Sequence, residues 1–161
     1  RRLIVHCAGG STLALVLLQA LSSFSTGGGI MHFDKKYLIC SLAYAAAGMC
    51  VGVYMGASQN HGELIAHAHI LLVGFVVSFI YGIIHKLWLN QPNRIIANTQ
   101  FWLHQIAAIV MFSGLLLLYG GVLPEATVGP VLGIASVGVL IGVLLMIFMV
   151  LKFSAEATHK A

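Results

Sequence analysis

The sequence predicts an all-α integral membrane protein, a bundle of four to five transmembrane helices, and three observations lead to this fold class. First, 60% of the 161 residues are hydrophobic and only 7% are charged, whereas about 25% of the residues in a soluble domain are charged. Second, the apolar residues occur in runs close to the ~20 residues that a helix needs to cross a bilayer. Third, short polar segments separate these runs. We therefore expect residues 1–161 to form a single membrane domain.

Each predicted helix corresponds to one apolar run. The runs cover residues 3–24, 37–58, 64–89, 101–122 and 128–153. The breaks between them contain Gly, Pro and Asn, which end helices for backbone reasons, and their short length makes consecutive helices antiparallel neighbours. The first run could instead be a signal peptide or a partial crossing, although it lacks a clear cleavage site. For this reason the predicted number of helices is four or five.

The distribution of charge predicts the orientation of the bundle. The side that holds residue 1 is named side A here, and the opposite side is side B. Lysine and arginine concentrate on side B, which the positive-inside rule makes cytoplasmic. They are Lys35, Lys36, Lys86, Arg94, Lys152 and Lys160. Arg1 and Arg2 do not follow this pattern. The lipid bilayer is the expected partner, and nucleic acid is excluded because no basic patch with interleaved aromatic residues is present.

Small residues recur at four-residue spacing in three of the runs. These positions are Gly48, Gly52 and Gly56; Gly74, Ser78 and Gly82; and Gly138 and Gly142. Such stripes allow helix backbones to approach closely in a membrane. The cysteines Cys7, Cys40 and Cys50 have no metal-ligand spacing, and we interpret them as small apolar residues.

The histidines are the candidate functional residues, because ionisable groups inside a membrane are costly and mark functional sites. Six of the eight lie in or beside the predicted helices: His6, His61, His67, His69, His85 and His104. His32 and His159 fall in a loop and in the tail, and we assign them no role. At 1.5 Å per residue, five of the six form two layers, and His61 lies at the membrane boundary on side A. His6, His67 and His69 lie near side A, whereas His85 and His104 lie near side B.

The direction of each side chain limits which histidines can bind the same ligand. His67 and His69 are about 200° apart around a helix and cannot both ligate one ion. His67 shares its face with Gly74, Ser78 and Gly82, a face that a flat macrocycle or a neighbouring helix could approach closely. Imidazole is an axial ligand of heme iron, and a bundle core provides an apolar slot for a porphyrin. Zinc or copper binding, a proton relay, and packing with hydrogen bonds to main-chain carbonyls remain alternatives.

A family resemblance adds to this interpretation. The stretch HAHILLVGFVVSFIYGIIHKLWL, with NTQFWLHQIAAIVMFSGLLLLYGG after it, resembles the tenth and eleventh helices of heme–copper oxidase subunit I. The shared features are His67-Ala68-His69, Leu72-Val73-Gly74-Phe75 and Phe101-Trp102-Leu103. The match covers about a third of the chain, and the length resembles that of the small, four-helix membrane proteins with an HAH motif that are grouped with this superfamily.

The resemblance implies roles for individual residues. It makes His67 the ligand of a high-spin heme and His69 the ligand of a low-spin heme, near the non-cytoplasmic face of a bacterial inner membrane. The motifs for the copper-site histidines, for the crosslinked tyrosine and for the helix with the second low-spin ligand are missing. We therefore expect neither copper nor a complete heme–copper active site. Without such a site, we predict no enzymatic activity for this chain.

The leading hypothesis is a heme-b-binding membrane protein for electron transfer or for heme or gas handling. One heme, or two, would be bound by residues chosen from His67, His69, His6, Gly74, His104 and His85. His6 would oppose His67 or His69 on side A, and His85 with His104 would hold a second heme on side B. Two alternatives remain. The chain could be an accessory or assembly subunit of a respiratory or oxidase-type complex, without its own cofactor. It could also be a metal or proton transporter. Besides the bilayer, the expected partners are a second copy of the chain in a homo-oligomer or a larger respiratory membrane complex.

Overall fold

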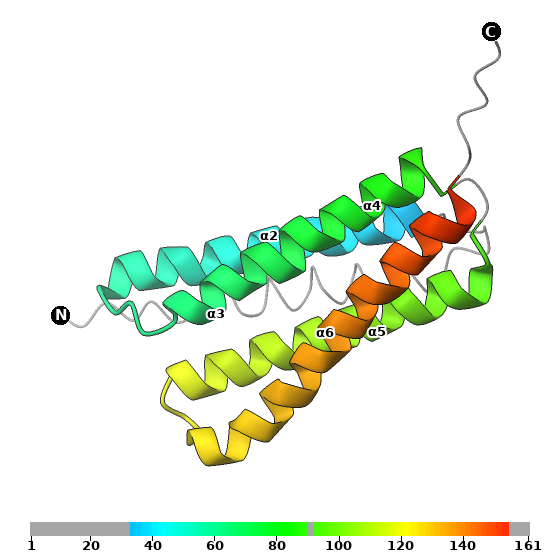
Figure 1. Ribbon diagram of the computed structural model, residues 1–161. Helices are drawn as coiled ribbons and strands as arrows, with labels where there is room; N and C mark the ends of the chain where they lie inside the picture. Colours follow the sequence, from blue (N-terminus) through cyan, green and yellow to red (C-terminus); the bar gives the residue numbers. More distant parts are fainter. Residues whose placement is uncertain (1–32, 90–91, 155–161) are drawn as a thin grey trace, which may run out of the picture.

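The computed structural model describes residues 33–89 and 92–154 as an all-α membrane bundle, which confirms the predicted fold class (Figure 1). Within these residues, four helical spans are long and apolar enough to cross a membrane. They are α2 (Phe33–Ser58), a continuous span of α3 (Leu64–His69), η1 (Ile70–Val77) and α4 (Ser78–Leu87), then α5 (Arg94–Tyr119) and α6 (Glu125–Phe153). The predicted span 3–24, with His6, lies outside the described residues.

Three of the four described spans begin earlier than the hydropathy of the sequence predicts, and the α3–η1–α4 span begins at Leu64 as predicted. α2 starts at Phe33 rather than at residue 37, and α5 starts at Arg94 rather than at residue 101. α5 begins early because a side chain caps its first turn. Asn93 Oδ1 accepts hydrogen bonds from the backbone N–H groups of Ile95 (2.9 Å) and Ile96 (3.4 Å). A capped helix end continues through polar residues at the membrane surface, where hydropathy alone places a loop.

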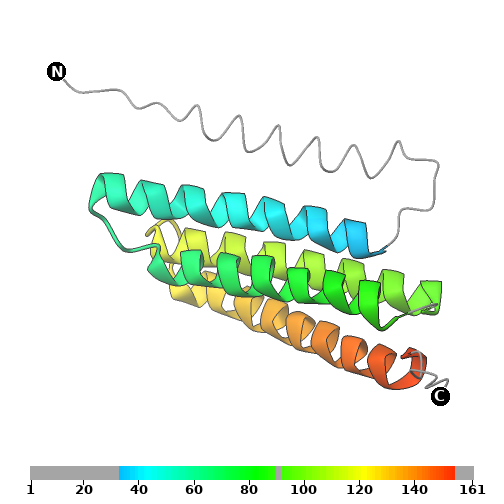
Figure 2. The same ribbon diagram turned by 90° about the horizontal axis from the view of Figure 1, so that it is seen from above.

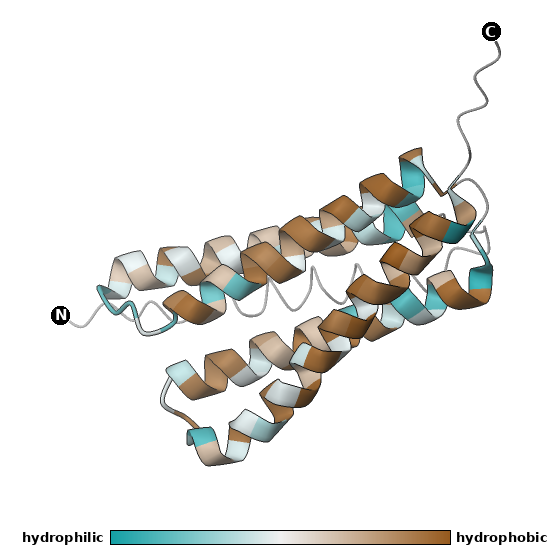
Figure 3. Cartoon of the chain, in the orientation of Figure 1, coloured by the Kyte–Doolittle hydropathy of each residue, from teal (hydrophilic) through white to brown (hydrophobic). Residues whose placement is uncertain are grey.

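The four spans form two antiparallel pairs. α2 packs along the α3–η1–α4 span, and α5 packs along α6 (Figures 1 and 2). α5 is the central helix, since half of its span is buried against 17–28% for the other described spans. Many large apolar side chains of all four spans are exposed on the outside of the described bundle, and Figure 3 shows how hydrophobic residues dominate each span. Apolar faces of this kind suit contact with lipid.

The predicted glycine stripes lie at the helix contacts, except at Gly56. A Cβ atom at Gly48 would overlap the Leu71 side chain, and one at Gly138 would lie 2.9 Å from the Ala107 Cβ atom. The stripe of α2 therefore packs on the span that carries His67, and the stripe of α6 packs on α5. Small residues at these contacts are the usual device for helix association in a membrane.

The span that carries the histidine pair contains a π-helix, which the sequence pattern did not predict. η1 runs from Ile70 to Val77 and separates α3, which holds His67 and His69, from α4. A π-helix has wider turns than an α-helix and rotates the residues that follow it relative to those before it. Its occurrence directly after the histidine pair marks this part of the span as a candidate functional region, since such segments are frequent at functional sites.

Candidate functional site: two layers of histidines

The side chain of His67, a residue of α3, packs against the glycine face of α2. Its Nδ1 atom is 2.9 Å from the carbonyl oxygen of Gly48, and because a carbonyl only accepts, the ring proton is on Nδ1. A Cβ atom at Gly52 would lie 3.1 Å from the Cε1 atom of the ring, so glycine provides the space for the imidazole. The lone pair of the neutral ring is therefore on Nε2, the atom available to a ligand.

Beside this ring, the face of α2 is open toward side A. No atom of the described residues outside its own helix turn lies within 4 Å of the position that a Cβ atom would take at Gly56, one turn beyond Gly52. The side chain of His67 is half-buried. A half-buried imidazole next to an unfilled glycine face is accessible from outside the described bundle.

His69 has the same tautomer but a different direction. Its Nδ1 atom donates to the carbonyl oxygen of Ile65, at 2.9 Å, within its own helix. Its Nε2 atom is again the one with the lone pair, and the ring is half-buried. Two histidines separated by one residue thus bond to different helices, as the 200° separation predicts. The structure does not bring them together.

Gly74 is a packing position. A Cβ atom there would lie 2.8 Å from the Cγ atom of Tyr44 and 3.0 Å from the Cε2 atom of Phe112. These two aromatic rings fill the space that the sequence pattern left open to a macrocycle or a neighbouring helix. The face at Gly74 is therefore occupied by side chains of the neighbouring helices α2 and α5.

The side B layer is tightly packed with aromatic residues. The His85 ring stacks on Phe33, with 5.4 Å between ring centroids, and on Tyr37, at 5.6 Å. His104 is fully buried and meets the ring of Tyr81 edge-on at 5.0 Å. Both imidazoles are thus enclosed by other side chains. A second heme held by His85 and His104 stays a prediction.

A buried hydrogen-bond network surrounds His104, and the sequence pattern did not predict it. The Tyr44 hydroxyl donates to Gln105 Oε1 (2.7 Å), and Gln105 Nε2 donates to the Ser78 hydroxyl (3.4 Å). Ser78 Oγ is 3.4 Å from His104 Nε2. Among the described residues, His104 Nδ1 makes no hydrogen bond of ordinary geometry.

A second network joins three helices next to it. The Tyr37 hydroxyl donates to Gln100 Oε1, and Gln100 Nε2 donates to the Gly142 carbonyl at 3.2 Å. Gln105 stands inside an apolar run, and its polar side chain there is a signal in the sequence that could have indicated the network. The sequence gives no such signal for Gln100, because hydropathy places this residue in the polar break before the run 101–122. Both amides stabilise the bundle by linking helices across its interior.

Glu63 lies just before α3, against the end of α5. Its Oε1 atom is 2.7 Å from the position of a Cβ atom at Gly120, and its Oε2 atom is buried without a hydrogen-bond partner among the described residues. Burial raises the pKa of this carboxyl above its ordinary value of 4.5. The partial negative charge at the C-terminal end of α5 disfavours the ionised form as well.

The raised pKa predicts how stability depends on pH. The folded state binds the Glu63 proton more tightly than the unfolded state, so this contribution is complete below pH 4.5 and is lost as pH rises through the folded-state pKa. We expect thermal unfolding in detergent to show a decrease in Tm over this interval in the wild type and a smaller decrease in Glu63→Gln. Identical pH profiles for the two proteins would contradict the assignment.

Two further observations complete the description. Among residues 33–89 and 92–154, no three His, Cys, Asp or Glu side chains gather into a metal site. Cys40 and Cys50 are free thiols, half-buried and exposed respectively.

Comparison with known protein families, with curated proteins and with solved structures finds no match for this chain. The fold and the residues themselves define it as a multi-pass membrane protein.

Proposed function

We propose that this chain binds heme b at its side A layer of histidines, with His67 as an axial ligand. The observation that carries the proposal is the hydrogen bond from His67 Nδ1 to the Gly48 carbonyl. Histidines that ligate a metal characteristically donate their other ring N–H to a carbonyl or carboxylate, which fixes the ring and raises its basicity. The bond to Gly48 therefore prepares Nε2 for iron.

The surroundings of His67 also fit a porphyrin. The ring lies against the glycines of α2 with open space beside Gly56, and the neighbouring surface is apolar. A porphyrin is flat and largely apolar, so it needs a slot with small residues along one wall. Bound heme would supply a redox-active iron at this end of the bundle.

His69 and His6 are the proposed candidates for the second axial position. His69 has the same ready tautomer but faces away from α2, so it would serve a partner helix, a second copy of the chain or a larger respiratory complex. His6 lies outside the described residues. The charge pattern supports a site near the non-cytoplasmic side of a bacterial inner membrane. Electron transfer, or the handling of heme or gases, is the proposed role.

The reduced protein tests the type of site. With two histidine ligands, we expect sharp α and Soret bands that carbon monoxide does not change, since a six-coordinate iron suits electron transfer. With one histidine, carbon monoxide should shift the Soret band, as for a site that binds small gases. Absence of both bands from protein produced with an adequate heme supply would contradict the proposal.

A further inference from the structure

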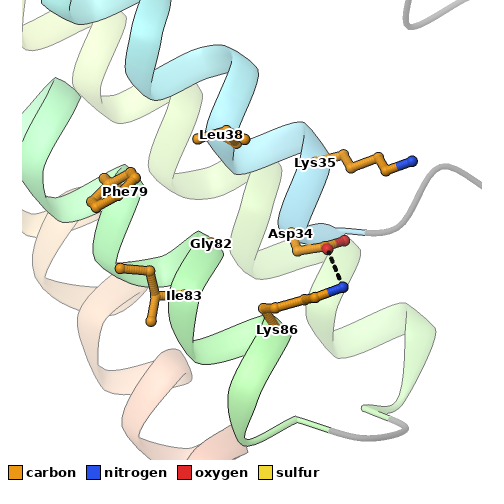
Figure 4. Close-up of a pocket in the computed structure, with 7 residues that line it drawn as sticks. All are labelled: Asp34, Lys35, Leu38, Phe79, Gly82, Ile83 and Lys86. Carbon is orange, nitrogen blue, oxygen red and sulfur yellow. Dashed lines mark ion pairs between the residues drawn. The ribbon is translucent and has the colours of Figure 1, made fainter.

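A groove with an apolar lining lies between the start of α2 and the end of α4, at the side B end of the bundle (Figure 4). It encloses about 270 Å³. Its lining residues are Asp34, Lys35, Leu38, Phe79, Gly82, Ile83 and Lys86. Sites for whole small molecules typically enclose about 300–1,000 Å³. The groove is therefore suited to a segment of a chain-like ligand.

The lining changes from charged to apolar along the helices. Asp34 and Lys35 are in the first turn of α2, and Lys86 is in the last turn of α4. At 1.5 Å per residue, Phe79 lies about 10 Å deeper in the membrane than Lys86. Leu38, Phe79 and Ile83 are partly exposed on the outward surface. This order, with charge at the surface and carbon below it, matches the order of headgroup and acyl chain in a phospholipid.

The charge at the mouth of the groove favours an anionic headgroup. The lining contains two lysines, Lys35 and Lys86, and one aspartate, Asp34. The Lys86 ammonium group points to the Asp34 carboxylate, whereas the Lys35 side chain extends away from both (Figure 4). Lys86 pairs with Asp34 at 3.7 Å, but its side chain is 71% exposed. Ion pairs this exposed contribute little to stability. Lys86 can therefore turn to a phosphate at small cost. Lys36, in the same turn, lies over the rings of Phe33 and Phe101 instead.

Asp34 supplies an observation of a different kind. Its Oδ2 atom pairs with Lys86, whereas its Oδ1 atom is buried and has no hydrogen-bond partner among the described residues. Buried polar atoms without a partner are uncommon and call for a donor. A hydroxyl group on the lipid headgroup would be such a donor once Lys86 turns to the phosphate and the Asp34 carboxylate rotates toward the groove. Phosphatidylglycerol combines this hydroxyl with the phosphate that the lysines require.

We propose that this groove is a binding site for one anionic phospholipid with a hydroxyl-bearing headgroup. The phosphate binds Lys86 and Lys35, the headgroup hydroxyl donates to Asp34, and one acyl chain lies along Gly82, Ile83 and Phe79. A basic pocket between helices on the cytoplasmic side is a recognised setting for anionic lipids. The site is independent of the heme proposal.

Native mass spectrometry with added lipid measures the headgroup preference. The probes are phosphatidylglycerol and phosphatidylcholine with the same acyl chains. We expect the wild type to retain one phosphatidylglycerol in preference to phosphatidylcholine. Lys86→Ala or Lys35→Ala should each reduce this preference about fivefold, the change expected for one lysine at a membrane surface. Lys152→Ala removes the same charge from α6, away from the groove, and should leave the preference unchanged.

A photoactivatable phosphatidylglycerol, with the reactive group on its acyl chain, tests the location. Crosslinks should map to Leu38, Phe79 and Ile83 and should be lost in Ile83→Trp, which fills the groove. The matched control Ile147→Trp, at an exposed position of α6, should retain them. Equal retention of the two lipids, or an equal loss of preference in Lys152→Ala, would overturn the proposal. So would crosslinks that avoid the groove, the result expected if residues 1–32 or a second copy of the chain covers it.

Discussion

His67→Ala is expected to remove the heme absorption of the purified protein almost completely. The substitution deletes Nε2, the proposed ligand atom, and also Nδ1, which donates to the Gly48 carbonyl. The loss of that hydrogen bond costs about 0.6–2 kcal/mol in a membrane bundle, which is too little to unfold it. The spectral change should therefore occur in a folded protein. Absorption spectra of equal protein amounts, with helix content from circular dichroism, measure both quantities.

His61→Ala is the matched control for this experiment. His61 is exposed in the loop on the same side of the bundle, just before α3 begins at Leu64. This variant should retain the full spectrum. An unaltered spectrum in His67→Ala would show that His67 packs α3 on α2 and does not ligate iron.

Gly74→Val is expected to give the largest loss of stability among glycine substitutions in the α3–η1–α4 span. Any Cβ atom at this position meets the Tyr44 ring at 2.8 Å and the Phe112 ring at 3.0 Å. Both rings are buried, and they pack edge-on against each other at 5.4 Å, so neither can move freely. Overpacking of this kind typically costs about 1–3 kcal/mol, and valine adds three carbon atoms, so a loss of about 3 kcal/mol is expected.

Gly133→Val provides the control for Gly74→Val. Gly133 is in α6, and no atom from a neighbouring element of the described bundle lies within 4 Å of its Cβ position. Unfolding in a denaturing detergent should therefore give a free energy close to that of the wild type for Gly133→Val. Equal stabilities for the two variants would contradict the packing described around Gly74.

Much of the fold could be predicted from the sequence because lipid imposes simple rules. A span needs about 20 apolar residues, so the positions of the four described helices followed from hydropathy. The ends of the helices did not, since the cap at Asn93 extends α5 through polar residues that hydropathy assigns to a loop. The π-helix η1 depends on how the span packs against its neighbours, and no residue pattern in the sequence indicates it.

The candidate site was predictable to a smaller extent. The opposite directions of His67 and His69 followed from helix geometry. The contact of His67 with Gly48 and Gly52 of α2 did not, because the sequence pattern relates His67 only to the small residues of its own span. The hydrogen bonds that fix both rings could not be predicted, because they depend on which carbonyl lies nearest. The aromatic enclosure of His85 and His104 was also beyond the sequence, since residues from α2, α4 and α5 create it.

The heme-to-protein ratio of the purified wild type tests the central claim most directly. The protein would be extracted in mild detergent from cells with an adequate heme supply, and the heme content would be measured against protein mass. We expect about one heme b per chain. If two copies share the iron through His67 or His69, we expect one heme b per two chains. A folded but colourless protein would contradict the heme proposal.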